Sequence, residues 1–342
     1  TTPPDGCPGM QEEIMATVRL TMSQALTRWM TAQSIEQLDG SIEPAFAGVW
    51  AIFGHGNVAG LGEALYGVRD QLPTYRGHNE QSMAHIAIAY AKQKQRRRMM
   101  AVTTSIGPGA TNLATAAALA HVNRLPVLLL PGDVFATRAP DPVLQQVESF
   151  ADGTVSANDC LRPISRYFDR ITRPEQLLQA LPKAMSVLTD PADCGPVTLG
   201  LCQDVQAEAW DYPESFFAPR VWHMRRISPD AAELSRAMEI LKSAKRPVIV
   251  AGGGVRYSGA SQALTAFAET AGIPVAATQA GKSSLVETHP MYVGSLGVTG
   301  ASAANSLAAK ADVVLSVGSR LQDFTTGSNS LISGQVVALN VQ

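Results

Sequence analysis

Glu80 and the glycine-rich segments on either side of it are the residues best suited to chemistry. Glu80 comes directly after Asn79 and three residues after Gly77, at the point where an extended pattern changes to a helical one. The same order of strand, glycine turn and helix recurs in Ile-Phe-Gly-His-Gly-Asn at 52–57 and Thr-Ser-Ile-Gly-Pro-Gly-Ala-Thr-Asn at 104–112. Ligands of parallel α/β sheets bind at the edge where such turns lie. The three segments together predict a cofactor site in which Glu80 is the one chemical group.

A glutamate at this position also has a plain structural explanation. A carboxylate in the first turn of a helix complements the helix dipole, which stabilises the helix by roughly 0.3–1 kcal/mol. The neighbours favour a functional role, because Gly77 permits close approach of a ligand and Asn79 can cap the helix. His55 and Asn57 lie where a substrate or cofactor could be contacted, and the packing of a tight turn explains them equally well.

Strands that alternate with amphipathic helices are expected to position these residues. Such a pattern is typical of a parallel sheet with helices on both faces. It occurs twice, so the predicted fold class is α/β with two doubly wound parallel-sheet units. The expected strands are 49–53, 72–76, 100–104, 126–130 and 196–201 in the first unit and 247–251, 274–278 and 313–317 in the second; the expected helices are 21–33, 80–91, 110–122, 230–242, 258–271 and 301–310.

The same pattern gives the expected domain boundaries. Residues 1–17, which contain several prolines and glycines, are interpreted as a loose leader or tail. A first domain spans 18–205 and a second spans 230–342. The intervening residues 206–229 are rich in tryptophan, proline and phenylalanine and are interpreted as an ordered linker. The sequence stops within an apolar run that is expected to be a strand, which indicates a second domain truncated at its C-terminus.

Composition argues against several classes of function. Hydrophobic residues make up 46% of the 342 residues, yet no run of eighteen apolar residues could cross a membrane. A formal net charge of −2 gives no field that would attract nucleic acid or an acidic lipid surface. The one basic run, from Lys92 to Arg98, is interpreted as a solvated helix terminus. The four cysteines form no CxxC pair and no secretory signal is evident, so the expected location is cytoplasmic.

Two glycine patterns suggest nucleotide binding but match incompletely. Residues 54–59 fit the G-x-G-x-x-A turn of dinucleotide-binding folds, but no acidic residue ends the next strand to hold the ribose. Residues 276–283 would form a phosphate-binding P-loop if Ala276 were glycine. The six histidines show no H-E-x-x-H or other tight ligand spacing, so no metal site is expected from this chain alone.

The order of the motifs resembles that of the thiamine-diphosphate enzymes, with the acetohydroxyacid synthase family as the nearest large group. Residues 52–57, 79–85 and 107–112 resemble the pyrimidine-binding domain of these enzymes. Residues 252–255 and 318–323 resemble their Rossmann-like central domain. The resemblance implies that both units take the corresponding folds.

The resemblance also implies roles for individual residues. Glu80 would be catalytic, because in the family a glutamate hydrogen-bonds to a ring nitrogen of the cofactor's aminopyrimidine and helps to activate it. Gln145 would face the active site of a neighbouring subunit in a homodimer or homotetramer. The expected cofactor-binding residues are Glu80, Gly54, His55, Gly107, Asn112 and Gln145.

A more specific set of motifs resembles a hydrolytic branch that opens a small cyclic 1,2-diketone. These motifs are residues 53–57, 131–138, 203–206 and 279–282. Two alternatives stay open. One is a carboligase or decarboxylase like acetohydroxyacid synthase, and the other is a non-catalytic fragment whose second domain binds a nucleotide such as FAD or NAD.

One element of the family pattern is missing from the sequence. These enzymes hold the cofactor's diphosphate through Mg²⁺ on a separate domain that carries Gly-Asp-Gly followed by Asn-Asn. No such motif occurs, and Gly132-Asp133-Val134 lies in the wrong domain. By itself, the chain is therefore expected to bind thiamine diphosphate weakly or not at all and to be inactive.

Overall fold

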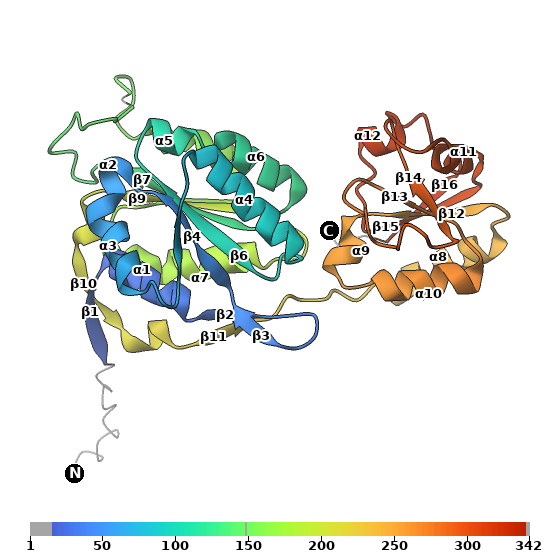
Figure 1. The fold of residues 1–342 in the computed structure, drawn as a ribbon, viewed down its shortest axis with the longest axis horizontal. Coiled ribbons are helices and arrows are strands. Elements are labelled where there is room, and N and C mark those ends of the chain that lie inside the picture. The colour runs from blue at the N-terminus through green and yellow to red at the C-terminus, as the bar shows by residue number, and fades with distance from the viewer. Residues whose placement is uncertain (1–15, 148, 340–342) are drawn as a thin grey trace, which may run out of the picture. The chain divides into compact units, whose positions relative to one another are not determined.

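The computed structural model describes residues 16–147 and 149–339 and divides into two compact units. The first unit runs to residue 189 and includes 194–223; the second comprises 190–193 and the residues from 224 onward. Each unit is built on its own parallel sheet, so the predicted α/β class with two parallel-sheet units is confirmed (Figure 1). Residues 1–15 of the predicted leader and residues 340–342 at the other end lie outside the described residues.

The central sheet of the first unit has six parallel strands in the order β5-β4-β6-β7-β9-β8. Strands β6, β7 and β9 are buried along their whole length. This burial explains why they read as continuous apolar runs in the sequence. The strands are β4 (Phe46–Ile52), β5 (Thr74–Arg76), β6 (Met99–Thr104), β7 (Val127–Asp133), β8 (Tyr167–Ile171) and β9 (Pro196–Cys202).

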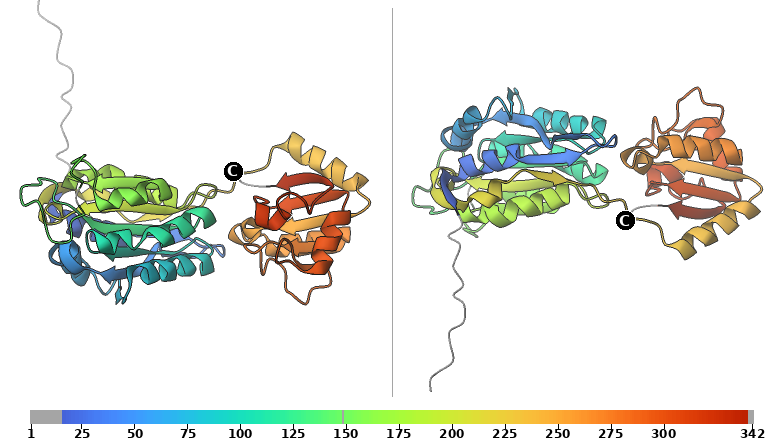
Figure 2. Two further views of the ribbon diagram at one scale, coloured as in Figure 1. Left: turned by 90° about the horizontal axis from the view of Figure 1, so that it is seen from above. Right: turned by 90° about the horizontal axis from the view of Figure 1, so that it is seen from below.

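Helices cover both faces of this sheet (Figure 2). One core joins buried residues of α1, α3 and α7 to strand residues such as Val49, Leu128 and Leu199. The helix predicted at 110–122 is two helices, because the chain tightens at Leu113, whose amide donates to the Ala110 carbonyl at 3.1 Å. The helical segments are α1 (Met22–Thr31), α2 (Gly54–Asn57), the π-helix η1 (Val58–Gly62), α3 (Glu63–Gly67), α4 (Glu80–Gln93), α5 (Pro108–Thr111), α6 (Ala114–Asn123), the 3₁₀ helix η2 (Ala157–Ile164), η3 (Pro174–Gln176) and α7 (Leu177–Leu188).

The segment predicted as a linker, 206–229, belongs to the first unit as far as residue 223. Its aromatic residues broke the periodicity because they pack into the core rather than along a helix. Tyr212 is fully buried and donates its hydroxyl to the Pro174 carbonyl at 2.9 Å, and Phe216 stacks on Trp29. The segment contributes η4 (Val205–Ala207), β10 (Ala209–Pro213), η5 (Glu214–Phe217) and β11 (Arg220–Trp222). Strand β10 pairs with β1 (Thr17–Thr21), and β11 pairs with β2 (Gln33–Glu36), which also pairs with β3 (Ile42–Pro44).

The basic run after α4 is less solvated than the sequence suggested. Arg96 and Arg97 are only 8% and 6% exposed, and the chain turns sharply there with φ of 67° at Arg96. The Arg97 guanidinium donates to the Glu36 carbonyl at 2.9 Å. The interpretation as a wholly solvated helix terminus is therefore wrong for these two residues, because the Arg97 side chain packs against β2 and the Arg96 side chain lies against the end of α6, 3.4 Å from the Asn123 carbonyl.

The second unit has five parallel strands in the order β14-β13-β12-β15-β16. Helices α8, α9 and α10 pack on one face around Ile249 and Leu315, and α11 packs on the other around Val250 and Val314. The elements are α8 (Ala231–Ser243), β12 (Pro247–Ala251), α9 (Gly253–Tyr257), α10 (Ser261–Ala271), β13 (Val275–Ala277), β14 (Tyr292–Ser295), α11 (Ser302–Lys310), β15 (Val313–Val317), α12 (Asp323–Thr326) and β16 (Gln335–Leu339). Among the residues described in either unit, no helix is both long enough and apolar enough to span a bilayer.

Candidate functional site

Glu80 is the first residue of α4, at the carboxyl edge of the six-stranded sheet. Asn79 precedes it in an extended conformation, and its side-chain oxygen accepts a hydrogen bond from the Ser82 amide at 2.9 Å. This N-cap satisfies one of the free amides of the first turn and begins the helix at Glu80. The Glu80 side chain is half-buried, so it can meet a ligand without losing contact with the protein.

Asn112, which follows α5, provides the partner of Glu80. Its side-chain Nδ2 donates to Glu80 Oε2 at 2.8 Å. The other carboxyl oxygen, Oε1, faces Gly109, where a built Cβ would lie 3.3 Å from it and would also collide with Ser105 Oγ. A glycine at 109 therefore lets Ser105 Oγ and Glu80 Oε1 pack close to the backbone there.

Ser105 brings the first glycine segment to the same place. Gly54 has φ of 47°, and a Cβ built on it would lie 2.7 Å from Ser105 Cβ. The Ile106 amide donates to the His55 carbonyl at 3.2 Å, and the His55 side chain is half-buried. Ser105, which the sequence did not single out, thus lies between Gly54 on one side and Gly109, next to Glu80, on the other. Its position directly after a buried strand was the available signal.

Gly107 and Gln145 also meet, although not as the resemblance implied. Gly107 has φ of 65°, and a Cβ there would overlap the backbone carbonyl oxygen of Gln145 in the same chain. Gln145 itself is exposed, with φ of 63°. The backbone of Gln145 therefore packs against its own subunit, and the role of its side chain in a neighbouring site stays a prediction.

A partly buried ion cluster joins β7 and β8, the two strands on either side of β9. Arg170 donates to Asp133 at 2.8 Å and to Asp159 at 2.7 Å. Burial would raise the pKa of Asp159, but hydrogen bonds from the Ser156 amide and from Arg170 lower it more, so the pKa lies below its ordinary value. The cluster holds the segment before η2 against the sheet and presents no free carboxylate to a ligand.

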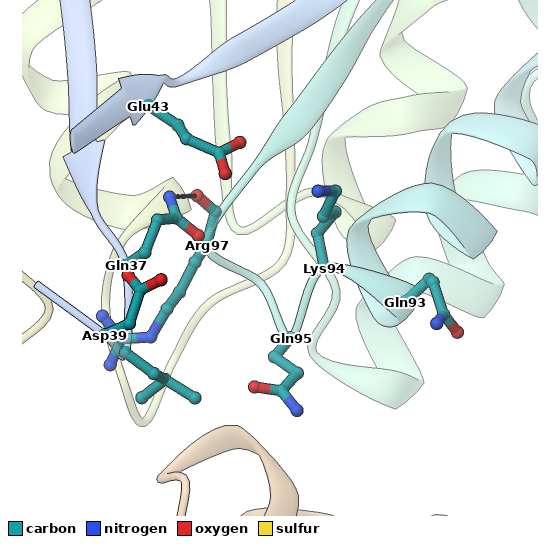
Figure 3. Close-up of a pocket in the computed structure, with 8 residues that line it drawn as sticks. Gln37, Asp39, Glu43, Gln93, Lys94, Gln95 and Arg97 are labelled. Atoms are coloured by element: carbon teal, nitrogen blue, oxygen red, sulfur yellow. Dashed lines mark hydrogen bonds between the residues drawn. The ribbon is translucent and has the colours of Figure 1, made fainter. Parts of the chain in front are cut away.

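A separate cavity of about 270 Å³ lies at the other end of α4. Its lining includes Gln93, Lys94 and Arg97, and Figure 3 shows Gln37 hydrogen-bonded to Arg97. The fourteen residues of α4 span about 20 Å. The cavity is therefore at the amino edge of the sheet, and its mixture of acidic and basic side chains is not part of the Glu80 site.

In the second unit, the glycine turns are filled by backbone. The Gly254 amide donates to the Gly318 carbonyl at 3.0 Å, and a Cβ on Gly254 would lie 2.7 Å from Gly318 Cα. A Cβ on Gly281 would collide with the Ala251 carbonyl. These glycines permit close packing of the backbone, and the first turn of the short α9, which contains Gly254, is engaged with the Gly318 carbonyl.

The comparison with family models matches both units. Residues 47–152 match the thiamine pyrophosphate enzyme, N-terminal TPP binding domain, and residues 234–342 match the thiamine pyrophosphate enzyme, central domain. The chain belongs to the thiamine pyrophosphate enzyme family.

Within that family, the chain is similar to curated proteins that share one name. The chain is 52% identical to the 3D-(3,5/4)-trihydroxycyclohexane-1,2-dione hydrolase of Geobacillus thermodenitrificans over 328 residues, which cover 96% of this chain and 51% of that protein. It is also 52% identical to hydrolases of the same name from Bacillus cereus and Bacillus anthracis, over 94% of this chain and 50% of theirs. The chain spans about half the length of these relatives.

The described residues fit the aminopyrimidine end of thiamine diphosphate. The carboxyl group of Glu80 is half-buried and hydrogen-bonded by Asn112, which suits a partner for a ring nitrogen of the aminopyrimidine. Across the ranges 16–147 and 149–339, no three His, Cys, Asp or Glu side chains gather as metal ligands.

Proposed function

We propose that this chain supplies the pyrimidine-binding part of a thiamine-diphosphate-dependent hydrolase that cleaves a carbon–carbon bond in trihydroxycyclohexane-1,2-dione. The supporting observation is the 2.8 Å hydrogen bond from Asn112 to Oε2 of Glu80, which is half-buried at the start of α4. The name shared by the relatives supports the substrate. The reaction would belong to inositol catabolism, in the cytoplasm.

In this proposal, Glu80 exchanges a proton with the cofactor's aminopyrimidine. Asn112 hydrogen-bonds to Oε2 of Glu80, so Oε1 is the oxygen that would form the hydrogen bond with the ring nitrogen. When bound, thiamine diphosphate supplies the carbon nucleophile for the diketone. A positioned acid or base of this kind contributes about 10²–10⁴-fold to the rate. Gly54 and His55 line the same edge of the site from the preceding segment.

The overall reaction adds one water molecule to the ring. The bond between the two carbonyl carbons breaks, one carbon receives hydroxyl to become a carboxylic acid, and the other receives hydrogen to become an aldehyde. The open-chain product is 5-deoxy-glucuronate. No separate oxidant or reductant is needed, because the gain and loss of electrons occur within the substrate.

The sequence lacks the family's Gly-Asp-Gly motif, and the described residues show no cluster of three His, Cys, Asp or Glu side chains, so the isolated chain is expected to bind the cofactor weakly and to be inactive. In the complete enzyme, Mg²⁺ and the diphosphate would be held by residues beyond those described, within a homodimer or homotetramer. The proposal includes no FAD or NAD in the second unit, because Gly254 and Gly318 are engaged in packing against each other.

The test is an assay of the complete gene product purified from its native cell. The protein is stripped of cofactor and supplied with the cyclic diketone or with pyruvate, with and without thiamine diphosphate and Mg²⁺, and the products are identified by mass spectrometry. We expect ring opening of the diketone only when the cofactor is added. Ring opening without the cofactor would overturn the proposal, and turnover of pyruvate alone would favour a carboligase or decarboxylase.

A further inference from the structure

Two buried amide side chains, Asn57 and Gln206, meet behind the Glu80 site. Asn57 is 0% exposed and Gln206 is 1% exposed, although they lie 149 residues apart. Gln206 Nε2 donates to Asn57 Oδ1 at 2.8 Å. A buried polar group without a partner costs about 1–3 kcal/mol, so each amide needs the other to remain in the interior.

Asn57 connects this pair to the middle of the sheet. Its Nδ2 donates to Thr103 Oγ1 at 2.7 Å and to the Thr104 carbonyl at 2.8 Å, at the end of β6. The Thr103 hydroxyl in turn donates to the Leu130 carbonyl of β7 at 2.8 Å. The side chain of Asn57 is therefore anchored to two central strands.

Gln206 holds the glycine turn from the other side. Its Nε2 also lies 3.0 Å from the Gly56 carbonyl, and its Oε1 accepts the Leu61 amide at 3.2 Å. These two contacts hold both ends of the irregular segment 56–61 against the turn that follows β9. Gly56 has φ of 108°, so this segment lacks regular helical hydrogen bonds at its start and depends on such contacts.

Two glycines make room for the pair. A Cβ on Gly60 would lie 2.6 Å from Gln206 Oε1, and a Cβ on Gly132 would lie 2.8 Å from Asn57 Oδ1. Three sequence motifs that seemed independent, around residues 54–60, 131–138 and 203–206, therefore form one buried structure. Their shared contact is the amide pair.

The pair sets the position of the turn beside Glu80. Gln206 holds Gly56 and Asn57 through hydrogen bonds. The preceding residue, His55, accepts a hydrogen bond from the Ile106 amide with its carbonyl oxygen. Gly54 packs on Ser105, which packs on Gly109 next to the Glu80 carboxyl group. We propose that Gln206 is a positioning residue that, through Asn57, holds the 54–57 turn against the cofactor side of the Glu80 site. This inference rests on the proposed function.

The first test compares two methionine substitutions in the complete enzyme. Gln206→Met removes the amide of the pair, and Gln33→Met removes an amide that is equally buried, at 1% exposure, in the same unit. Gln33 donates to the Trp29 carbonyl and accepts the Trp222 indole, each at 2.9 Å, and is bonded to no site residue. We expect Gln206→Met to raise the KM for thiamine diphosphate about tenfold, which corresponds to about 1.4 kcal/mol, and Gln33→Met to leave it unchanged.

Equal KM values for the two variants, measured at a temperature where both are folded, would overturn the inference. A second readout needs no activity and uses the chain itself. Hydrogen exchange at the Ile106 amide is expected to accelerate at least tenfold in Gln206→Met and not in Gln33→Met. Unchanged exchange would also contradict the inference, whereas a wild-type enzyme with no cofactor-dependent hydrolysis would refute the proposed function alone.

Gln206→Glu is a conservative substitution that is expected to keep the contact with Asn57 only while the new carboxyl group is protonated. The new carboxyl group would be buried among three acceptors, namely Asn57 Oδ1 and the carbonyls of Gly56 and Leu201. Such surroundings raise a carboxyl pKa, and the neutral form can still donate one hydrogen bond. We expect the KM for the cofactor to be near the wild-type value at low pH and to rise with pH, whereas Gln206→Met gains no new pH dependence. A flat profile for Gln206→Glu would contradict the positioning role.

Discussion

Several glycines at the carboxyl edges of the two sheets meet different kinds of neighbour, although Gly107 of the first unit also meets a backbone oxygen, that of Gln145. In the first unit, Gly60, Gly109 and Gly132 make room for polar side chains, namely Gln206, Ser105 with Glu80, and Asn57. In the second unit, a Cβ on Gly252, Gly254 or Gly281 would meet backbone atoms of a neighbouring loop.

This difference shows why a glycine turn alone is weak evidence for a ligand site. A glycine indicates that something approaches the backbone closely, but not whether that neighbour is a side chain, a backbone or a ligand. In the first unit, one such glycine, Gly109, lies beside the half-buried carboxylate of Glu80. The three predictions below separate the polar arrangement of the first unit from the backbone packing of the second.

Glu80→Gln is expected to have the largest effect. The amide still accepts from Asn112 and keeps the shape of the side chain, but it cannot exchange a proton with the cofactor. We expect kcat of the complete enzyme to fall at least about a hundredfold. The measurement is steady-state turnover of the diketone at saturating thiamine diphosphate.

The matched control for this change is Glu63→Gln. Glu63 also lies in the first turn of a helix, is exposed and complements the dipole of α3. Near-normal turnover is expected for this variant. If Glu80→Gln and Glu63→Gln were equally active, Glu80 would merely complement its helix dipole as well.

Gly132→Ala is expected to destabilise the first unit by about 1–3 kcal/mol, because its Cβ would overlap Asn57 Oδ1. Asn57→Ser removes that oxygen, so the cost of Gly132→Ala should be smaller in the double variant. Urea unfolding followed by tryptophan fluorescence measures this, since all four tryptophans lie in the first unit.

Gly254→Ala serves as the comparison in the second unit. The Cβ that this substitution adds would meet Gly318 Cα, a backbone atom that no side-chain substitution removes. Gly254→Ala is therefore expected to destabilise the second unit by the same amount with or without Asn57→Ser, as followed by circular dichroism. Additive effects for Gly132→Ala and Asn57→Ser would show that the side chain of Asn57 is not what requires Gly132.

Asp204→Asn is expected to have the smallest effect and to depend on pH. Asp204 accepts the amides of Ala136 and Thr137 at 2.8 and 3.1 Å. Burial would raise the pKa of Asp204, but these amides lower it more, so the folded pKa lies below the unfolded value. Its stabilisation is thus present above about pH 4 and is lost as the pH falls through the folded pKa. We expect Asp204→Asn to lower the free energy of unfolding by about 1 kcal/mol at pH 7.

The cost of Asp204→Asn should shrink in unfolding experiments below pH 4, with fluorescence as the readout. Asp312 is the counterpart in the second unit, where it accepts the amides of Lys245 and Arg246 at 2.7 and 2.8 Å. It lies at the amino edge of its sheet, so Asp312→Asn should leave the first unit and the turnover of the enzyme unchanged. A cost of Asp204→Asn that stayed constant with pH would exclude its charge as the cause.

The amino-acid sequence by itself determined the local features of the fold. The apolar runs of β6, β7 and β9 and the start of α4 at Glu80 follow from hydrophobic pattern and capping, which depend on near neighbours in the chain. Glycine turns after three of the strands were also visible. These features were sufficient to predict the fold class and to select Glu80.

Only the tertiary structure decided which of these features meet. Asn112 reaches Glu80 across 32 residues and Gln206 reaches Asn57 across 149, because strand order and register bring the ends of β4, β6 and β9 to one edge. The inclusion of residues 209–222 in the first unit likewise depends on pairing with β1 and β2. Periodicity carries no information about such distant partners, and therefore the site could be predicted only in part.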